Sequence, residues 1–364
     1  MVTPYRRIEN ANMGHSNAPP IYEGPADWRG PSIKNSADWH INLTKRQISE
    51  IKSAVQHSID DETPIADLRP ATFALPHLRH VLKAAYQELL HGRGFVMFHG
   101  MPVQDLNREE IIRAYVGVGS WLGEPVPQNG KGHILGHVKD IGLDHTNPQT
   151  RIYGTRHRQL YHTDGADLVG LLCLQTAKSG GVFSLSSSVA VYNEIARRRP
   201  DLAAVLSAPF VVDRKGEVPQ GKQDTYEIEV FHHYKGRLLT IHDRVFIDAA
   251  QHRDYVPRLT AQQIEALDLL DELAGSDEFY LDVAWEQGDI NFAHNHQVLH
   301  ARTDYEDYPE LDRKRHLLRL WLSTNEGWEL PPVFAEKFST VELGQRRGGI
   351  HVPGVEPTVP LEAE

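Results

Sequence analysis

The chain has almost no cysteine. Its 364 residues include one, Cys173, so no disulfide can form within the chain. Disulfides accumulate in oxidising compartments, and their absence therefore favours a reducing one, so we expect a cytoplasmic protein. Cys173 lies in the apolar run LVGLLCL (168–174), which favours a buried structural thiol over a nucleophile.

Long apolar runs and a secretory leader are also missing. The longest apolar stretches, such as LVGLLCL, are far shorter than the roughly 20 residues that cross a bilayer. The first residues, MVTPYRRIENANMGH, contain no apolar signal core. We therefore expect neither a membrane partner nor secretion.

Basic residues are fewer than acidic ones. The chain has 38 lysines and arginines against 49 acids, which gives a formal net charge of −11 with its 21 histidines neutral. A protein of this charge is poorly suited to bind a phosphate backbone, so we expect no nucleic-acid partner. A small-molecule substrate fits better, and the sequence leaves open whether the chain forms a homo-oligomer.

Apolar periodicity predicts helices first and then mostly strands, with helical insertions near 188–206 and 259–275. Helical spacing is found in 43–56, 76–94, 106–123, 188–206 and 259–275. Strands are predicted at 94–103, 168–178, 278–285, 289–295 and 316–323, with a hairpin over 225–243 that turns at Lys235-Gly236. This order favours an α+β protein built on a β core.

Composition divides the chain into three parts. Residues 1–42 are rich in Pro, Gly, Asn and Asp without a sustained period, and we expect an N-terminal surface arm. Residues 43–343 are expected to form a single catalytic domain that includes both helical insertions. Residues 344–364 are rich in Gly and Pro and are expected to form a C-terminal tail outside the core.

One long segment of the expected domain lacks a clear period. Residues 124–160 are rich in Gly, Pro, His and Asn, and a loop of this length in a compact domain is usually functional or disordered. Gln128 and Asn129 in this segment are therefore candidates to line a substrate pocket as part of a lid or wall. The alternative is a plain surface loop.

A His-x-Asp triplet precedes the apolar strand predicted at 168–178. The stretch YHTDGAD (161–167) places His162 and Asp164 two residues apart, and on a strand such residues point to the same side. Among 21 histidines and 49 acids such triplets also arise by chance, and His252-Arg253-Asp254 is a second one. Spacing alone therefore does not separate half of a metal site from a polar turn.

The segment 288–323 supplies what the triplet lacks. Non-haem iron oxygenases hold Fe(II) with two imidazoles and one carboxylate. A 2-oxoglutarate co-substrate would also need an arginine for its distal carboxylate. The expected order is therefore His-x-Asp, a long gap, a histidine, a short gap and arginine on a strand, and after His162 and Asp164 the chain continues with His300, Arg315 and Arg319.

Five stretches resemble the TauD/TfdA (taurine dioxygenase, clavaminate-synthase-like) family of Fe(II)/2-oxoglutarate dioxygenases, in the family's order. They are GRGFVMFHGMPV (92–103), YHTDG (161–165), SGG (179–181) with the polar strand after it, GDINFAHNHQVLHART (288–303) and RKRHLLRLWLS (313–323). The resemblance implies a double-stranded β-helix (jelly-roll, cupin-like) core with flanking helices. It also implies conversion of 2-oxoglutarate and O2 to succinate and CO2, coupled to oxidation of a C–H bond in a small polar or anionic substrate such as an amino acid.

Matched position by position, the resemblance implies that His162, Asp164 and His300 bind the Fe(II). Arg315 matches the arginine that pairs with the distal carboxylate of 2-oxoglutarate. Arg319 matches a second arginine that can hold an anion of the co-substrate or the substrate.

The resemblance also extends to further positions, where this chain partly departs from the family's pattern. Asn295 aligns with the asparagine of the family's DN pair and is a candidate to contact the substrate. Tyr161 is expected either to line the pocket or simply to pack. Where the family usually has a threonine that binds 2-oxoglutarate, this chain has Phe183, and Ser184 can replace that contact only through a shift in register. The polar residues specific for taurine find no match.

Two other functions use the same ligand set. A zinc-dependent hydrolase would hold its metal and a water with two histidines and a carboxylate, but it leaves the GD…HAR…R-x-x-x-R pattern without a role. A non-catalytic, cupin-like small-molecule binding protein is the other alternative, and the complete ligand set argues against it.

Overall fold

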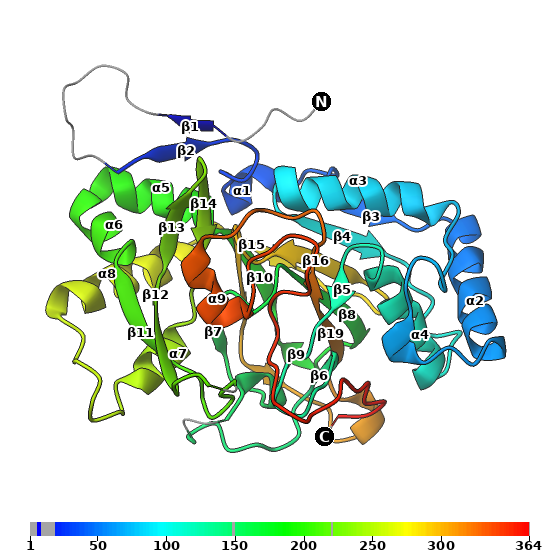
Figure 1. Ribbon diagram of the computed structural model, residues 1–364. Helices are drawn as coiled ribbons and strands as arrows, with labels where there is room; N and C mark the ends of the chain where they lie inside the picture. The colour runs from blue at the N-terminus through cyan, green and yellow to red at the C-terminus, as the bar shows by residue number, and fades with distance from the viewer. Residues whose placement is uncertain (1–5, 9–18, 148–149, 220, 364) are drawn as a thin grey trace.

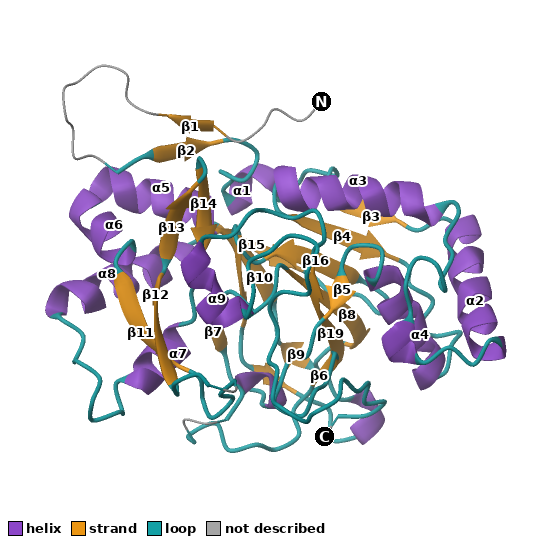
Figure 2. Ribbon diagram, in the orientation of Figure 1, coloured by secondary structure: helices purple, strands orange, loops and turns teal. Residues whose placement is uncertain are grey.

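Two β-sheets pack face to face at the centre of the molecule, and helices cover their outer faces (Figures 1 and 2). The computed structural model describes residues 6–8, 19–147, 150–219 and 221–363. No helix in these ranges has the length and apolar character needed to cross a membrane. The expected N-terminal arm is described only at 6–8 and from residue 19 onward, and the stretch examined for a signal core falls almost entirely outside the described residues.

The larger sheet has seven strands within the described residues, in the order β3-β4-β16-β8-β19-β5, with β6 also paired to β19. Neighbours run antiparallel except β3 and β4, which are parallel. The strands are β3 (His40–Asn42), β4 (Phe95–His99), β5 (Glu124–Pro125), β6 (Leu135–Val138), β8 (Leu168–Gln175), β16 (Ile290–His294) and β19 (His316–Ser323).

The smaller sheet has the order β15-β10-β17-β7 and is antiparallel throughout. Its strands are β7 (Gln159–His162), β10 (Phe183–Ser187), β15 (Tyr280–Val283) and β17 (Val298–Arg302). Leu185 of this sheet and Leu171 and Trp321 of the larger one belong to one buried cluster between the sheets. This is the double-stranded β-helix core that the resemblance implied. Cys173 lies in the same cluster, and burial raises the pKa of its thiol to about 12, as expected for a structural cysteine.

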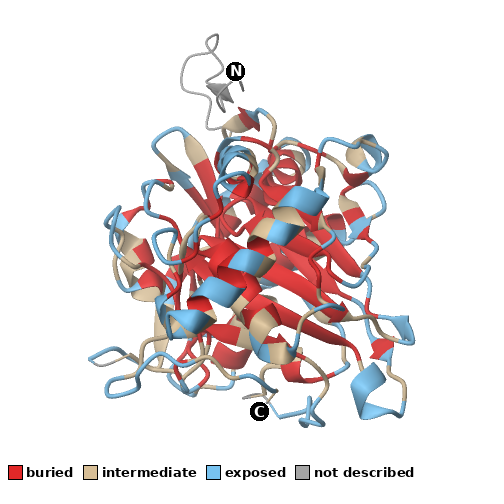
Figure 3. Ribbon diagram, turned by 90° about the vertical axis from the view of Figure 1, so that its right-hand side faces the viewer, coloured by how far each residue is buried: buried red, intermediate tan, exposed pale blue. Residues whose placement is uncertain are grey.

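Helices pack on the outer faces because each has one apolar side. Three of them cover the larger sheet: α2 (Lys45–Asp60), α3 (Leu78–His91) and α4 (Arg108–Gly119). Three others cover the smaller sheet: α5 (Ser188–Arg198), α6 (Pro200–Leu206) and α8 (Ala261–Ala274). Figure 3 shows a helix with an exposed outer face crossing in front of buried strands, which is the amphipathic pattern that predicted these helices.

The predicted helix ends agree with their capping chemistry. Thr260 accepts a hydrogen bond from the backbone N–H of Gln263 and caps α8, and Asn107 caps α4 in the same way through Glu110. Pro200 separates α5 from α6, because proline fits the first turn of a helix but interrupts a helix interior.

The predicted hairpin over 225–243 is partly wrong. Its turn at Lys235-Gly236 is present between β13 (Phe231–Tyr234) and β14 (Arg237–Thr240). However, the first part of the range forms β12 (Thr225–Glu229), which pairs with β11 (Pro209–Asp213) instead. The chain bends at Val230, whose backbone bonds to Leu206 and Ile241 and so ends one ladder before the next begins.

The remaining elements are short. The strands are β1 (Arg6–Ile8), β2 (Ile21–Glu23), β9 (Ser179–Gly180) and β18 (Tyr305–Glu306). The helices are α1 (Gly30–Ile33), α7 (Arg244–Ala250) and α9 (Ala335–Phe338), with single 3-10 turns at Ile65–Asp67, Ile152–Gly154, Leu311–Arg313 and Pro332–Phe334.

The described parts of the expected arm and of the expected tail contain residues that are more deeply packed than the sequence suggested. Trp28 and Trp39, in the expected surface arm, are buried against Phe95 of β4. Arg347, in the expected tail, is fully buried, and its Nε donates to Oδ2 of Asp167 at 2.8 Å. These large side chains find apolar or charged partners in the core, which composition alone does not reveal. The boundaries at residues 42 and 343 remain a prediction.

The pair of Arg347 and Asp167 gives a test of this packing. We expect Arg347→Met to lower the free energy of unfolding by about 3–5 kcal/mol, because Asp167 would stay buried without its charged partner. Arg346→Met is the matched control: Arg346 pairs with Glu124 at a partly exposed site, and its loss should cost less than about 1 kcal/mol. Urea denaturation of both variants measures the difference, and equal effects would show that the C-terminal segment is not anchored here.

Candidate active site

The three expected metal ligands meet at one edge of the smaller sheet. His162 is the last residue of β7, and His300 faces it across the antiparallel pair of β7 and β17. The carboxylate oxygens of Asp164 lie 3.9 Å from Nε2 of His162 and 3.5 Å from Nε2 of His300. One ligand atom from each residue lies within 4.8 Å of the others. Two segments far apart in sequence thus form one cluster.

The cluster fits a divalent metal such as iron. All three side chains are buried, and Oδ2 of Asp164 has no hydrogen-bond partner among the described residues. A buried carboxylate oxygen without a partner is costly, and a cation between the three side chains would satisfy it. Two imidazoles and a carboxylate also form the donor set that leaves open positions on Fe(II).

The hydrogen bonds around His162 direct its free nitrogen toward the cluster. Its Nδ1 lies 2.8 Å from the carbonyl of Leu160, which favours the tautomer with the hydrogen on Nδ1 and leaves Nε2 as the ligand atom. The side-chain amide of Gln159 lies 2.8 Å from that Nε2. A metal bound to Nε2 would replace this contact.

The local electrostatics keep the ligands in the protonation states that metals require. Burial, together with the neighbouring His300, lowers the pKa of His162 to about 3, so this imidazole is neutral near pH 7. Burial alone would raise the pKa of Asp164, but Arg319 and His300 outweigh it and hold that pKa below its usual range. A neutral imidazole and a charged carboxylate can therefore bind a metal without losing a proton first.

Asn295 holds the loop that carries Asp164. Its Oδ1 accepts from the backbone N–H of Asp164 at 3.0 Å, and its Nδ2 donates to the carbonyl of Ala166 at 2.8 Å. Thr163 is fixed in turn by the backbone of His242. Both ends of the Asn295 amide are used to position the ligand loop, and a contact of Asn295 with substrate stays a prediction.

The two expected arginines differ in their surroundings. Arg319 lies in β19, where its Nη1 is 3.6 Å from Oδ1 of Asp164 and its Nε donates to Oε1 of Gln128. Arg315 lies one residue before β19, is buried, and has no partner for its Nη1 among the described residues. It lies over the ring of Tyr305 at 5.2 Å. Arg315 thus keeps a buried donor available for an anion.

Sequence reasoning missed a third buried arginine. Arg302 lies on β17 two residues after His300, and its Nε and Nη1 have no partner among the described residues. Burial and the nearby Arg315 lower the pKa of Arg302 to about 10. Strand alternation in β17 places Arg302 on the same face as the candidate ligand His300, a signal that was lost because this strand was not predicted from the sequence.

Ser184 and Tyr161 are not brought to the site. On β10, Leu185 pairs with His300 and Phe183 faces the same interior, 6.1 Å from the imidazole of His300. Ser184 therefore points to the opposite face, where its hydroxyl donates to Asp282. Tyr161 also lies on that side and interacts with Ser184. The expected register shift does not occur, and Phe183 holds the interior position.

Gln128 and Asn129 lie near the site without lining its cavity. Gln128 is buried, and its amide donates to the backbone carbonyls of Ile134 and Arg319. Asn129 shapes a turn by accepting from the backbone N–H of Lys131. Gln128 fixes Arg319, and a contact of Gln128 or Asn129 with substrate stays a prediction. The wall expected from 124–160 is supplied by its later part, including Arg151, Ile152 and Tyr153.

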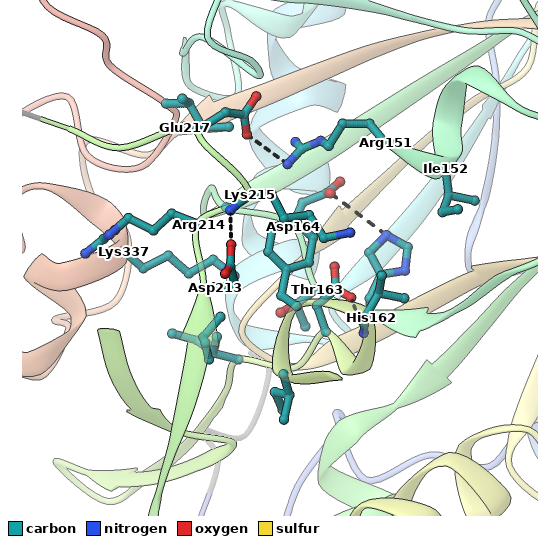
Figure 4. Close-up of a pocket in the computed structure, with 18 of the residues that line it drawn as sticks. Arg151, Ile152, His162, Thr163, Asp164, Asp213, Arg214, Lys215, Glu217 and Lys337 are labelled. Carbon is teal, nitrogen blue, oxygen red and sulfur yellow. Dashed lines mark hydrogen bonds and ion pairs between the residues drawn. The ribbon is translucent and has the colours of Figure 1, made fainter. Parts of the chain in front are cut away.

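A cavity of about 300 Å³ opens beside the candidate ligands (Figure 4). His162, Asp164 and Arg319 form one side of it. The facing side comes from the inserted segment of β11 to α7 and from α9. A cavity of this size, next to a metal site and lined by apolar and charged side chains, fits a small polar molecule.

The chain is similar to known proteins over most of its length. The family model described as taurine catabolism dioxygenase TauD, TfdA family matches residues 61–321. FR-33289 synthase of Streptomyces rubellomurinus is 28% identical over 312 residues, which cover 85% of this chain and 92% of that one. Uridine-5'-phosphate dioxygenase of an Amycolatopsis species is 29% identical over 216 residues, covering 54% and 74%.

A solved structure shows the same fold. Asparagine oxygenase, in complex with Fe(II), (2S,3S)-3-hydroxyasparagine and succinate, aligns with a TM-score of 0.60 at 16% identity, covering 78% of this chain and 94% of that one. The shared fold confirms the double-stranded β-helix predicted from the sequence.

The two His-x-Asp triplets provide a controlled test of the metal ligands. We expect His162→Ala to abolish stoichiometric Fe(II) binding. The variant keeps only two of the three candidate ligands, Asp164 and His300, and so lacks one of the two imidazoles. His252→Ala removes the histidine of the second triplet, which is exposed and outside the cluster, and should leave binding unchanged. Anaerobic titration calorimetry with Fe(II) measures both variants. Full binding by His162→Ala would contradict the assignment.

Proposed function

The chain belongs to the TauD/TfdA family of taurine catabolism dioxygenases, and we propose that His162, Asp164 and His300 hold its catalytic iron. The protein is an Fe(II)/2-oxoglutarate-dependent dioxygenase that couples oxidation of a C–H bond to formation of succinate and CO2. Bound Fe(II) supplies the activation of dioxygen. The zinc hydrolase and the non-catalytic binding protein considered from the sequence are therefore set aside.

One observation carries the assignment of the iron ligands. His162 and Asp164 line the cavity, while hydrogen bonds to Leu160 and Asn295, respectively, fix them from behind. The open side of the cluster thus faces the space in which a substrate would lie. The protein's role is to hold this geometry before substrate arrives, so that little reorganisation is needed at the moment of reaction.

We propose that Arg315 binds the distal carboxylate of 2-oxoglutarate. Its Nη1 is buried and has no partner among the described residues, and Arg315 lies close enough to Arg302, on the strand that carries His300, to lower the pKa of that arginine. Arg302 adds a second positive charge nearby, and an anion between them would relieve their mutual repulsion. Phe183 and Trp321 line the same interior and exclude water from it.

The substrate we propose is an amino acid or a related small acid that is hydroxylated. By their names, one relative acts on uridine 5'-phosphate, and the structural neighbour was solved with a hydroxylated amino acid. The cavity of about 300 Å³ accommodates a molecule of that class. The charged side chains around it favour a polar substrate over an apolar one.

We also propose that the protein works in the cytoplasm and binds neither nucleic acid nor a membrane. The net charge of −11 and the single, buried cysteine support this proposal. A homo-oligomer remains compatible with these features.

The reaction can be tested by succinate release. We expect protein loaded with Fe(II) and 2-oxoglutarate to form succinate under air, and a screen of amino acids, sulfonates and carboxylates should reveal compounds that stimulate it. The absence of any succinate dependent on 2-oxoglutarate would contradict the proposed function.

Arg315 provides the matching test of co-substrate binding. Arg315→Gln should raise the KM for 2-oxoglutarate by about 10- to 100-fold, because a hydrogen bond from a charged group to a carboxylate contributes roughly 1.5–3 kcal/mol. Arg313→Gln is the control, since Arg313 is exposed and pairs with Glu310 on the surface. An unchanged KM in Arg315→Gln would place the co-substrate elsewhere.

A further inference from the structure

Two lysines from separate elements meet in the cavity beside the candidate iron site. Lys215 lies in the turn after β11 and is 8% exposed, and Lys337 lies on α9; both line the cavity (Figure 4). A Cβ added to Gly165 would lie 3.7 Å from Cε of Lys337, so the stem of this lysine passes directly over the residue that follows Asp164.

Neither lysine has a carboxylate at ion-pair distance within the described part of the chain, because the acids around them are used elsewhere. Asp213 pairs with Arg253 at 2.7 Å, and Glu217 pairs with Arg151 at 3.0 Å. Asp243 caps α7 by accepting from the backbone N–H of Val245.

The charge of this wall follows from these pairings. Burial lowers the pKa of Lys215 and of Lys337, and Arg151 lowers both further. Asp243 acts in the opposite direction on both lysines, as do Asp213 and Glu217 on Lys215 and Asp164 on Lys337. The last three acids, however, already lie beside arginines, namely Arg253, Arg151 and Arg319. Burying cations without enough counter-charge costs free energy, so an anion bound at this wall would be stabilised.

The backbone at Lys215 points to the same conclusion. Four residues other than glycine have a positive φ among the described residues, and three of them (Glu62, Lys235 and Ser339) are exposed. Lys215, with φ +50°, is the buried one. A glycine would take this conformation without strain. The strained backbone at Lys215 therefore supports a functional role for its side chain, which lines the cavity.

The neighbours of the two lysines hold them together. Arg214 donates to the backbone carbonyl of Glu336 at 2.8 Å and pairs with its carboxylate at 3.1 Å. Lys222 pairs with the same carboxylate at 2.9 Å. Glu336 thus neutralises the outer cations, whereas the adjacent Lys215 and Lys337 turn inward. The turn after β11 and α9 are tied in the arrangement that brings both ammonium groups to one cavity.

We propose that Lys215 and Lys337 bind the acid group of the substrate, a carboxylate, phosphate or phosphonate, beside the iron site. This inference rests on the proposed function and narrows its substrate class to organic acids. The co-substrate is also an acid, but its proposed anchor, Arg315, does not line this cavity, so the two anions occupy different positions. The rest of the cavity wall near the lysines is apolar, with Ile228, Val230 and Ile241, which suits an uncharged carbon chain attached to the acid.

Matched small probes test this recognition without requiring turnover. We expect pentanoate or butylphosphonate to bind the protein loaded with Fe(II) and 2-oxoglutarate under anaerobic conditions, and the neutral pentanamide not to bind. Titration calorimetry measures all three, and comparison of the two acids shows which head group the lysines accept. Failure of both acids to bind, or equal binding of the amide, would overturn the proposal.

Three variants assign the binding to the lysines. Lys337→Met and Lys215→Gly should weaken the acid that binds by at least about tenfold, as expected for the loss of a charged hydrogen bond. Lys235→Met is the control, because Lys235 is exposed, pairs with Glu329 on the surface and does not line the cavity; it should change the affinity less than about twofold. Because glycine relieves the positive φ, Lys215→Gly should also raise the melting temperature while it loses the ligand, which separates recognition from folding.

Two further measurements separate this proposal from a role of the lysines in co-substrate binding and from the proposed function. The dissociation constant of 2-oxoglutarate should be the same within about twofold in all variants; if the lysine variants weaken 2-oxoglutarate instead, the lysines hold the co-substrate and the proposal is wrong. Succinate formation by the unsubstituted protein, measured separately, reports on the proposed function. An inactive protein that still binds acids through Lys215 and Lys337 would contradict that function and leave the anion site in place.

Discussion

The register between β7 and β17 is the constraint on which the site depends. Because His300 lies opposite His162, both imidazoles point into the space between the sheets, and the regular pairing of β17 with β10 places Arg302 on the same face. A slip of one residue would turn each of these side chains outward. The same rule sends Ser184 away from the iron site and leaves Phe183 inside. The fold therefore determines the chemistry of the interior through the pairing of β17 with its two neighbours, β7 and β10.

That interior carries more positive than negative charge. Arg302, Arg315 and Arg319 are buried with few carboxylates beside them, and Asp164 is the acid nearest to Arg319. Burying cations in this way opposes folding, so the arrangement is less stable than a neutral core would be. A co-substrate with two carboxylates would supply the missing charge. The protein thus keeps an electrostatic imbalance that binding removes, and the hydrogen bonds of Gln128 to Arg319 hold that side chain ready.

Long apolar strands and well-capped helices could be predicted from the sequence, because they bury surface in a regular pattern. The strand at 316–323 has the predicted bounds, and Thr260 caps its helix as expected. β17 was not predicted, because all five of its residues are buried and it shows no alternation. The three candidate ligands could nevertheless be named from their chemistry and order without the strand, and the structure brings them together. The contacts that Asn295 and Ser184 make could not be predicted, because they depend on register and on neighbours distant in sequence, which periodicity does not contain.

The cavity wall opposite the proposed iron site is held in place by different contacts from those of the core. Lys215 lies in a strained turn and Lys337 on a helix of four residues, elements too short to leave a periodic signal. Their positions depend on the link of Arg214 to Glu336, a tertiary contact between residues distant in the chain. The core strands fix the iron ligands through many backbone hydrogen bonds, whereas this wall is fixed by a few side chains. Substitutions in the wall can therefore change which acid is held while the iron geometry stays intact.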